Sequence, residues 1–217
     1  MTIDLHTTSL PEAVYNTLRE SIIASTDPPG SVLTEAAVSA RYGVARPTAK
    51  AAIERLVSEG LLRRSAHRTA QVPVLDESDI FDLYASRVVV EEAALRNLAL
   101  AGVVPVAAVS AHRELKVVAD SGEPTSYARA DIAFHRALVL GQRSPRLAKM
   151  HALIMGEIEL CIGQVDSNSL LTAADVAAQH QGILDAVIGA DPELAGTRTR
   201  EHILTSRDRL LNYKHGA

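Results

Sequence analysis

The 217-residue chain is long enough for two small domains or one large one, and its composition favours helices, with no tryptophan and only 3% aromatic residues. Its formal net charge of −4 is unevenly distributed. Residues 1–74 carry eight basic and seven acidic side chains, whereas residues 75–217 carry fourteen basic and nineteen acidic ones. Only the first part is therefore expected to bind nucleic acid. The sequence has no apolar run of about 18 residues, no signal-peptide pattern and one cysteine, Cys161, which predicts a cytoplasmic protein without a membrane span or disulfide.

An amphipathic helix over residues 11–24 is the first predicted element. Apolar residues recur every four positions along it and just before it, which places them on one helical face. These residues are Leu10, Val14, Leu18 and Ile22. The segment Asp27-Pro28-Pro29-Gly30 ends the helix, because consecutive prolines cannot continue it.

A helix-turn-helix is predicted next. Thr34 is suited to cap a short helix over residues 35–42, and Gly43 supplies the stop that allows a sharp turn. A second helix is predicted over residues 46–59. A two-stranded ribbon then follows over residues 61–64 and 68–72. Helix, turn, helix and ribbon in this order form a winged helix-turn-helix.

The second helix of this module has two different faces. Arg46 and Lys50 lie four residues apart on one side, while the opposite side is apolar. The residues predicted to pack inward are Ala49, Ile53, Leu56 and Val57. From Arg41 to Arg68 there are seven basic and two acidic side chains, a surface suited to phosphates, and an arginine at a helix start can read a guanine edge. The alternative is a solvated helix that happens to be basic.

Residues 75–217 are predicted to be helical almost throughout, after a linker at Pro73–Glu77. Glycines, prolines and capping residues divide this part into six helices with short connections. The predicted helices cover residues 78–101, 105–120, 125–140, 146–164, 172–189 and 191–213. The expected fold is therefore mainly α: a winged helix-turn-helix domain over residues 1–74 and an antiparallel six-helix bundle over residues 75–217. Cys161 is predicted to be a small core residue.

One carboxylate and three imidazoles of the second domain could converge. Asp131 and His135 are four residues apart, so they project from one helical face, and His180 and His202 lie in the two last predicted helices. Such a set inside a bundle suits zinc, or a similar ion such as nickel or manganese. The spacing also occurs by chance, and single histidines in helices are commonly structural. The other three histidines of this domain, His112, His151 and His215, are predicted to lie at the surface.

Arg87 lies among apolar residues of the first bundle helix. Three interpretations stay open: the side chain reaches the surface, pairs with Glu91, or faces a cavity. In the third case the planar guanidinium implies an acidic ligand, because its two parallel donors match a carboxylate.

Several motifs together resemble the GntR-type bacterial regulators, FadR-like subfamily. The first domain has Pro-Pro-Gly at 28–30, Gly-Val-Ala-Arg at 43–46 and Glu-Gly-Leu-Leu at 59–62. The second domain is similar to the effector domain called FCD. It contains Arg87 with Glu91, Asp131-x-x-Phe134-His135, His180 before Ile-Leu-Asp-Ala, and His202. Six bundle helices are similar to the VanR-like branch.

The resemblance implies roles for particular residues. DNA contacts are implied for Arg46, Thr48, Lys50, His67 and Arg68. A divalent metal bound by Asp131, His135, His180 and His202 is implied beside a small carboxylate effector, with Arg87 lining the effector pocket. The chain departs from the family at several positions, among them Ala36 in place of an arginine in some relatives and Ser144 in place of a common asparagine. Lys50 replaces an arginine, so the planar guanidinium with its two parallel donors is absent there. Ala51 replaces a glutamate, and Thr69 stands where the wing usually has glycine.

The sequence thus predicts a dimeric DNA-binding transcription regulator, a repressor released from its operator by a small organic acid bound near the metal. Two alternatives remain at this stage. A metal-dependent hydrolytic enzyme could use the Asp/His3 site to activate water, and a structural nucleoid protein could use the DNA-binding module alone.

Overall fold

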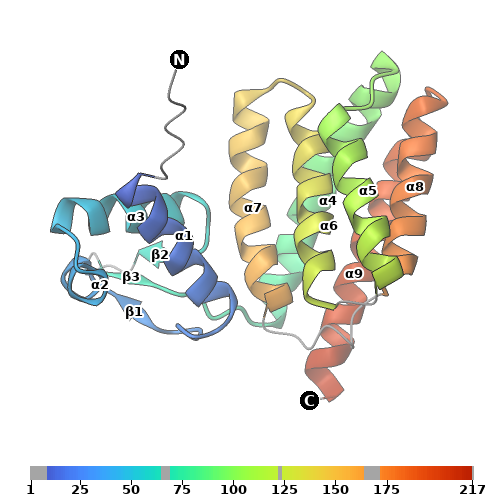
Figure 1. Cartoon of the computed structure of the whole chain (residues 1–217). Coiled ribbons are helices and arrows are strands. Elements are labelled where there is room, and N and C mark those ends of the chain that lie inside the picture. The colour runs from blue at the N-terminus through green and yellow to red at the C-terminus, as the bar shows by residue number, and fades with distance from the viewer. Residues whose placement is uncertain (1–8, 65–68, 122–123, 164–171, 217) are drawn as a thin grey trace, which may run out of the picture. The chain divides into compact units, whose positions relative to one another are not determined.

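A computed structural model describes residues 9–64, 69–121, 124–163 and 172–216 (Figure 1). The predicted wing residues His67 and Arg68 lie outside these ranges. The described residues divide into two compact units, Met1–Val74 and Leu75–Ala217. The fold is mostly helical, as predicted.

Where the structure describes it, the first unit contains three helices, α1 (Leu10–Ile23), α2 (Glu35–Tyr42) and α3 (Arg46–Ser58). Three short strands form one antiparallel sheet in the order β1-β3-β2. They are β1 (Val32–Leu33), β2 (Arg63–Arg64) and β3 (Ala70–Gln71). Strands β2 and β3 are the predicted ribbon, whereas β1 was not predicted: it has two residues, too few for a periodic pattern, and it pairs Val32 with Gln71 far along the chain.

Local sequence signals set the bounds of the two helices in the helix-turn-helix. The Thr34 hydroxyl accepts a hydrogen bond from the Ala37 N–H at 3.1 Å and so caps α2. Gly43 has φ of 63°, a left-handed conformation that costs glycine nothing and turns the chain toward α3. Ala49, Ile53 and Leu56 of α3 are buried as predicted. Val57 is only partly buried.

In its described residues the second unit is a bundle of six helices, drawn from green to red in Figure 1. They are α4 (Glu77–Ala101), α5 (Val106–Ser121), α6 (Pro124–Leu140), α7 (Pro145–Gly163), α8 (Ala173–Ile188) and α9 (Pro192–Gly216). Helix α4 contacts α6, α7, α8 and α9, so it lies at the centre of the bundle. A capping box of Asp76 and Asp79 begins α4, and Gly102 ends it in a left-handed conformation.

The bundle core consists of aliphatic side chains with Phe134 and Tyr84 among them. Cys161 belongs to this core, as predicted, and is a free thiol. No single helix in the described part of the chain is long and apolar enough to cross a membrane. The α4–α5 pair, bent by 115° at its break, meets that length and composition only when both helices are taken together.

Candidate metal centre and nucleic-acid interface

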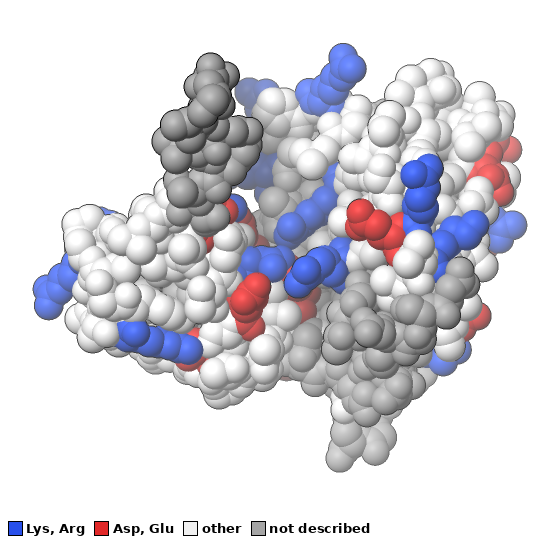
Figure 2. Space-filling view, in the orientation of Figure 1, with Lys and Arg blue, Asp and Glu red and all other residues white. Residues whose placement is uncertain are grey.

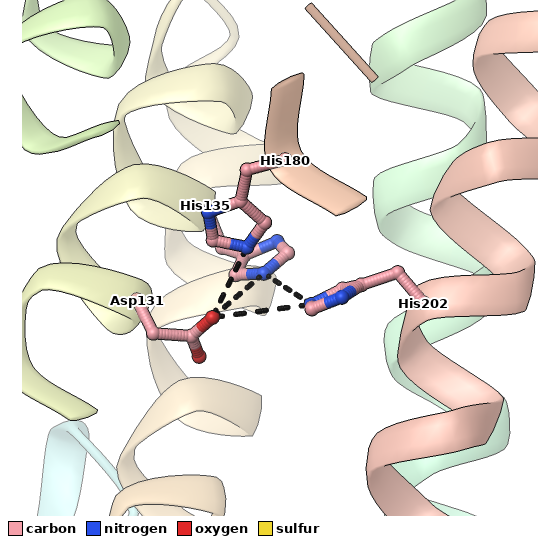
Figure 3. A group of neighbouring side chains, drawn as sticks. All are labelled: Asp131, His135, His180 and His202. Carbon is pink, nitrogen blue, oxygen red and sulfur yellow. Dashed lines mark hydrogen bonds and ion pairs between the residues drawn. The ribbon is translucent and has the colours of Figure 1, made fainter. Parts of the chain in front are cut away.

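The structure brings the four predicted metal-binding residues together inside the second unit (Figure 3). Asp131 and His135 project from adjacent turns of α6, His180 comes from α8, and His202 comes from α9. All four side chains are buried, and one donor atom from each lies within 4.8 Å of the others. Residues of α6, α8 and α9 therefore meet at one polar point inside the bundle.

All three imidazoles direct Nε2 toward the same carboxylate oxygen. Asp131 Oδ1 lies 3.1 Å from His180 Nε2, 3.6 Å from His135 Nε2 and 3.9 Å from His202 Nε2. Among the described residues, Asp131 Oδ1 and both ring nitrogens of His180 have no hydrogen-bond partner of ordinary geometry. Buried polar atoms without partners are costly, and a shared cation would satisfy them. One carboxylate and three neutral imidazoles fit a divalent transition metal.

The protonation of the three histidines differs. Burial, with some help from His135, lowers the pKa of His180 to about 4, against the attraction of Asp131. Burial and then the neighbouring His180 and His135 hold the pKa of His202 well below its usual value. These two imidazoles are therefore neutral at neutral pH and offer lone pairs.

His135 is the exception. Burial lowers its pKa, but the charge of Glu91, the nearby Asp131 and the hydrogen bond to Glu91 outweigh burial, so the net shift is upward. A protonated His135 also explains the 3.0 Å contact between its Nε2 and His202 Nε2, because one nitrogen donates and the other accepts. A metal ion would replace that proton.

Asp131 is the anionic member of the cluster. Burial alone would raise its pKa, yet the close polar contacts and charges of His135 and His180 hold the pKa well below its usual value. The carboxylate is thus ionised and able to act as a ligand throughout the neutral range.

Partners outside the cluster orient two of the rings. His135 donates from Nδ1 to Glu91 Oε2 at 2.6 Å, and His202 donates from Nδ1 to Gln179 Oε1 at 2.7 Å. Both bonds leave Nε2 directed at Asp131. Sequence reasoning did not find either partner, because Glu91 was assigned only to Arg87 and Gln179 matches no motif.

Arg87 is buried and pairs with Glu91, the second of the three interpretations. Its Nε donates to Glu91 Oε1 at 2.8 Å. Its Nη2 is buried and has no hydrogen-bond partner among the described residues. The pair with Glu91 therefore leaves the Nη2 donors of the guanidinium available to another group.

Two histidines predicted to be at the surface are buried, and the prediction was wrong for both. His151 of α7 donates from Nε2 to Glu91 Oε1 at 2.9 Å. His112 of α5 bonds Gln181 at 3.1 Å. His151 precedes the core residues Met155 and Ile158 at helical spacing, a signal that could have placed it inward. The side chain of His215 lies outside the described residues.

A groove between α8 and α9 reaches the outer edge of the cluster. Gln179 and Gly182 of α8 and Arg198, Thr205 and His202 of α9 line it. Nothing lies within 4 Å of where a Gly182 Cβ would stand, so the groove is open there. Solvent therefore comes close to His202 although that ring is buried.

The predicted DNA contacts that are described lie on the exposed face of α3. Arg46 and Lys50 are exposed and Thr48 is half-buried. Arg46 also lines a hollow between the start of α3 and the sheet, with Arg64 and Thr69. On the face that Figure 2 shows, basic and acidic side chains are interspersed and form no single basic field.

Both units match known families. Residues 10–72 match the bacterial regulatory proteins of the gntR family, and residues 82–205 match the FCD domain. A curated relative from Paenarthrobacter nicotinovorans, the "Probable D-xylose utilization operon transcriptional repressor", is 27% identical over 188 residues, which cover 82% of this chain and 76% of the relative.

Solved structures are similar over nearly the whole chain. A structure described as the transcriptional regulator GntR from Rhodococcus sp. RHA1 has a TM-score of 0.75 and 25% identity, covering 93% of this chain and 97% of that one. E. coli McbR/YncC has a TM-score of 0.74 and 18% identity, covering 94% and 98%, and shows the likeness of the fold.

Proposed function

This chain belongs to the gntR family of bacterial regulatory proteins and carries an FCD domain, and from this premise we propose that it is a homodimeric repressor that a small organic acid releases from DNA. The family makes it a DNA-binding transcription regulator and not an enzyme, so the hydrolytic alternative loses its support. A nucleoid protein would leave the effector domain without a role.

The proposed DNA contacts come from α3. Arg46 stands at the start of the helix, where a guanidinium can bond a guanine edge, and Lys50 is one turn further on the exposed side. Lys50 offers a point charge for a phosphate and no fork, so it contributes affinity more than sequence preference. Thr48, His67 and Arg68 complete the proposed contact set.

The proposed effector domain holds one divalent ion, with zinc the first candidate and nickel or manganese the alternatives. The single observation that carries this proposal is the convergence of four buried donor atoms within 4.8 Å, several of them without partners. A bound ion supplies a Lewis-acid position for one carboxylate oxygen of an effector. Asp131, His135, His180 and His202 would hold the ion.

Arg87 is the proposed second contact for the acid. An anion entering the bundle loses hydration and needs compensating donors, and the unpartnered Nη2 of Arg87 offers one. The charge of Asp131 acts on Arg87, which places the two groups in the same electrostatic environment. The acid would thus bind between the ion and Arg87, and the bundle would pass its binding on to the DNA-reading unit.

Arg87→Lys tests the effector site more sharply than Arg87→Ala. Lysine keeps a positive charge beside Glu91, whereas alanine breaks a buried pair, which costs about 3–5 kcal/mol of stability. We expect Arg87→Lys to retain zinc and operator binding but to bind the acid at least tenfold more weakly, because an ammonium lacks the planar fork.

The measurement is calorimetric titration of a carboxylate panel into the zinc-loaded protein, paired with operator binding by fluorescence anisotropy. The wild type should lose operator affinity when an acid from the panel binds. An acid that binds the wild type and Arg87→Lys equally would remove Arg87 from the site. Equal affinity of the wild type for operator and scrambled DNA would contradict the repressor proposal.

A further inference from the structure

Glu91 is a fully buried carboxylate at the centre of the bundle, and the proposed metal site does not use it as a ligand. It lies on α4, the helix that contacts four of the other five. Its side chain is 0% exposed in the described structure. A charge in that position requires an unusually complete set of partners, since burying an unpaired carboxylate is prohibitive.

Three groups on three helices meet that requirement. Oε1 accepts from Arg87 Nε at 2.8 Å and from His151 Nε2 at 2.9 Å, while Oε2 accepts from His135 Nδ1 at 2.6 Å. Arg87 comes from α4, His135 from α6 and His151 from α7. Oε1 of Glu91 is thus bonded to Arg87 and His151, and Oε2 accepts its hydrogen bond from His135.

The bond to Oε2 determines which nitrogen of His135 can bind a metal. Nδ1 must carry a hydrogen to donate to an ionised carboxylate, so only Nε2 can present a lone pair. That Nε2 lies 3.6 Å from Asp131 Oδ1 and 3.0 Å from His202 Nε2, inside the cluster. Turning the ring over would leave the buried Glu91 oxygen without its donor.

The three histidines of the cluster are not held equally. His202 is oriented by the neutral amide of Gln179, and His180 Nδ1 has no partner among the described residues. Of the three, and among the described residues, only His135 donates from Nδ1 to a carboxylate. Hydrogen bonding to a carboxylate fixes the tautomer of a metal-binding imidazole and makes it a stronger donor.

We propose that Glu91 is a positioning residue of the metal centre, which holds His135 with Nε2 toward the ion and is itself held by Arg87 and His151. This inference rests on the proposed metal binding and deepens it. It gives Glu91 a role beyond the structural partner of Arg87, and it gives His151 a reason to be buried.

Glu91→Gln is the decisive variant, and its neighbour Glu92→Gln is the matched control. Glutamine keeps the shape of the side chain but removes the charge and one acceptor. Glu92 is also on α4, and its side chain accepts hydrogen bonds from Arg96 and Arg200. We expect Glu91→Gln to bind zinc about 10–100-fold more weakly in competition with a chromogenic chelator, and Glu92→Gln to bind it like the wild type. Glu91→Asp, which keeps the charge but is one methylene shorter, should recover part of the loss.

Two further measurements separate positioning from a general loss of packing. The cobalt-substituted protein should show an altered visible absorption spectrum in Glu91→Gln and an unaltered one in Glu92→Gln, because the spectrum reports ligand geometry. In the zinc-loaded wild type, nitrogen NMR of His135 should show Nδ1 protonated and Nε2 bound to metal, a result that needs no variant to fold.

Zinc affinity within twofold of the wild type in a folded Glu91→Gln, or coordination of His135 through Nδ1, would overturn the inference. The failure of this inference is distinguishable from that of the proposed function. If the wild type itself binds no divalent ion, the metal proposal falls and this one with it. If the wild type binds zinc and Glu91→Gln binds it equally well, only the role of Glu91 is rejected.

Discussion

His135 and His202 are neighbouring imidazoles whose pKa values are shifted in opposite directions. Burial and the nearby histidines hold the pKa of His202 well below its usual value, whereas the charge of Glu91 and hydrogen bonds overcome burial and raise that of His135. The raised pKa favours a second proton on the His135 ring, whereas His180, with a pKa of about 4, is a neutral imidazole at neutral pH. The directions of these pKa shifts indicate which histidine would release a proton when a metal ion binds.

We predict that binding of one zinc ion near pH 7 releases about one proton, from His135. Affinity should fall as pH falls through the raised pKa of His135, since below it a proton competes for Nε2. His180 and His202 should add little until the pH is far lower. Calorimetry in buffers of different ionisation enthalpy measures the proton count. Release of two or more protons would contradict the assignment of His180 and His202 as neutral.

From the sequence, roles in the site could be predicted only for residues that belong to a recognisable motif. The spacing of Asp131 and His135 and the family resemblance identified the metal-binding candidates. Glu91 and Gln179 act through hydrogen bonds between different helices, and no local pattern encodes such contacts. His151 was wrongly predicted to lie at the surface, because its buried partner Glu91 is on another helix and could not be identified from the sequence.

Helix α3 combines a buried apolar side with an exposed basic side, and the two sides have separable functions. Ala49, Ile53 and Leu56 fix the helix to the first unit, and Arg46 and Lys50 remain free of that packing. Substitutions on the exposed side can therefore change DNA binding without unfolding the unit.

We expect Arg46→Ala to cost about 1–3 kcal/mol of operator binding and to relax base preference. Lys50→Ala should weaken binding to all sequences alike and reduce the dependence on salt, because it removes one phosphate contact. Anisotropy titrations against operator and single-base variants, at several salt concentrations, separate the two effects. A uniform loss for Arg46→Ala would assign it to a phosphate.

Helices could be predicted from the sequence more closely than strands. Thr34, Gly43 and Gly102 are local stop and start signals, and the observed helices begin and end within a few residues of the predicted bounds. Strand β1 depends on β3, which lies almost forty positions later, so its two residues carry no signal of their own. The physical difference is that helical hydrogen bonds are local and sheet pairing is not.

At the scale of the whole chain, the order of a DNA-reading unit followed by an effector unit matches regulators of one family. Two-fold symmetric proteins read palindromic sites, so the proposed dimer predicts an operator of two inverted half-sites. Operator binding that responds to an effector would require both units, because neither unit alone has both roles.

Native mass spectrometry should show a dimer with one divalent ion per chain. Replacing His180 by alanine should remove the ion and lower the unfolding temperature, because an ion bound only to the folded state stabilises it. Glu92→Gln provides the comparison variant, with metal content unchanged. A His180→Ala protein that retains a full complement of metal would show that the ion is bound elsewhere.

A bound ion would also affect how long the effector domain survives in the cell. The first and last of the four residues, Asp131 and His202, are separated by three interhelical connections, and a bound ion would join α6, α8 and α9 much as a covalent cross-link does. Closing so long a segment removes chain entropy from the locally opened states that proteases attack. Metal supply would then set the lifetime of the regulator as well as its response, so that scarcity of the ion removes the protein from its operators by turnover, even when no acid is present.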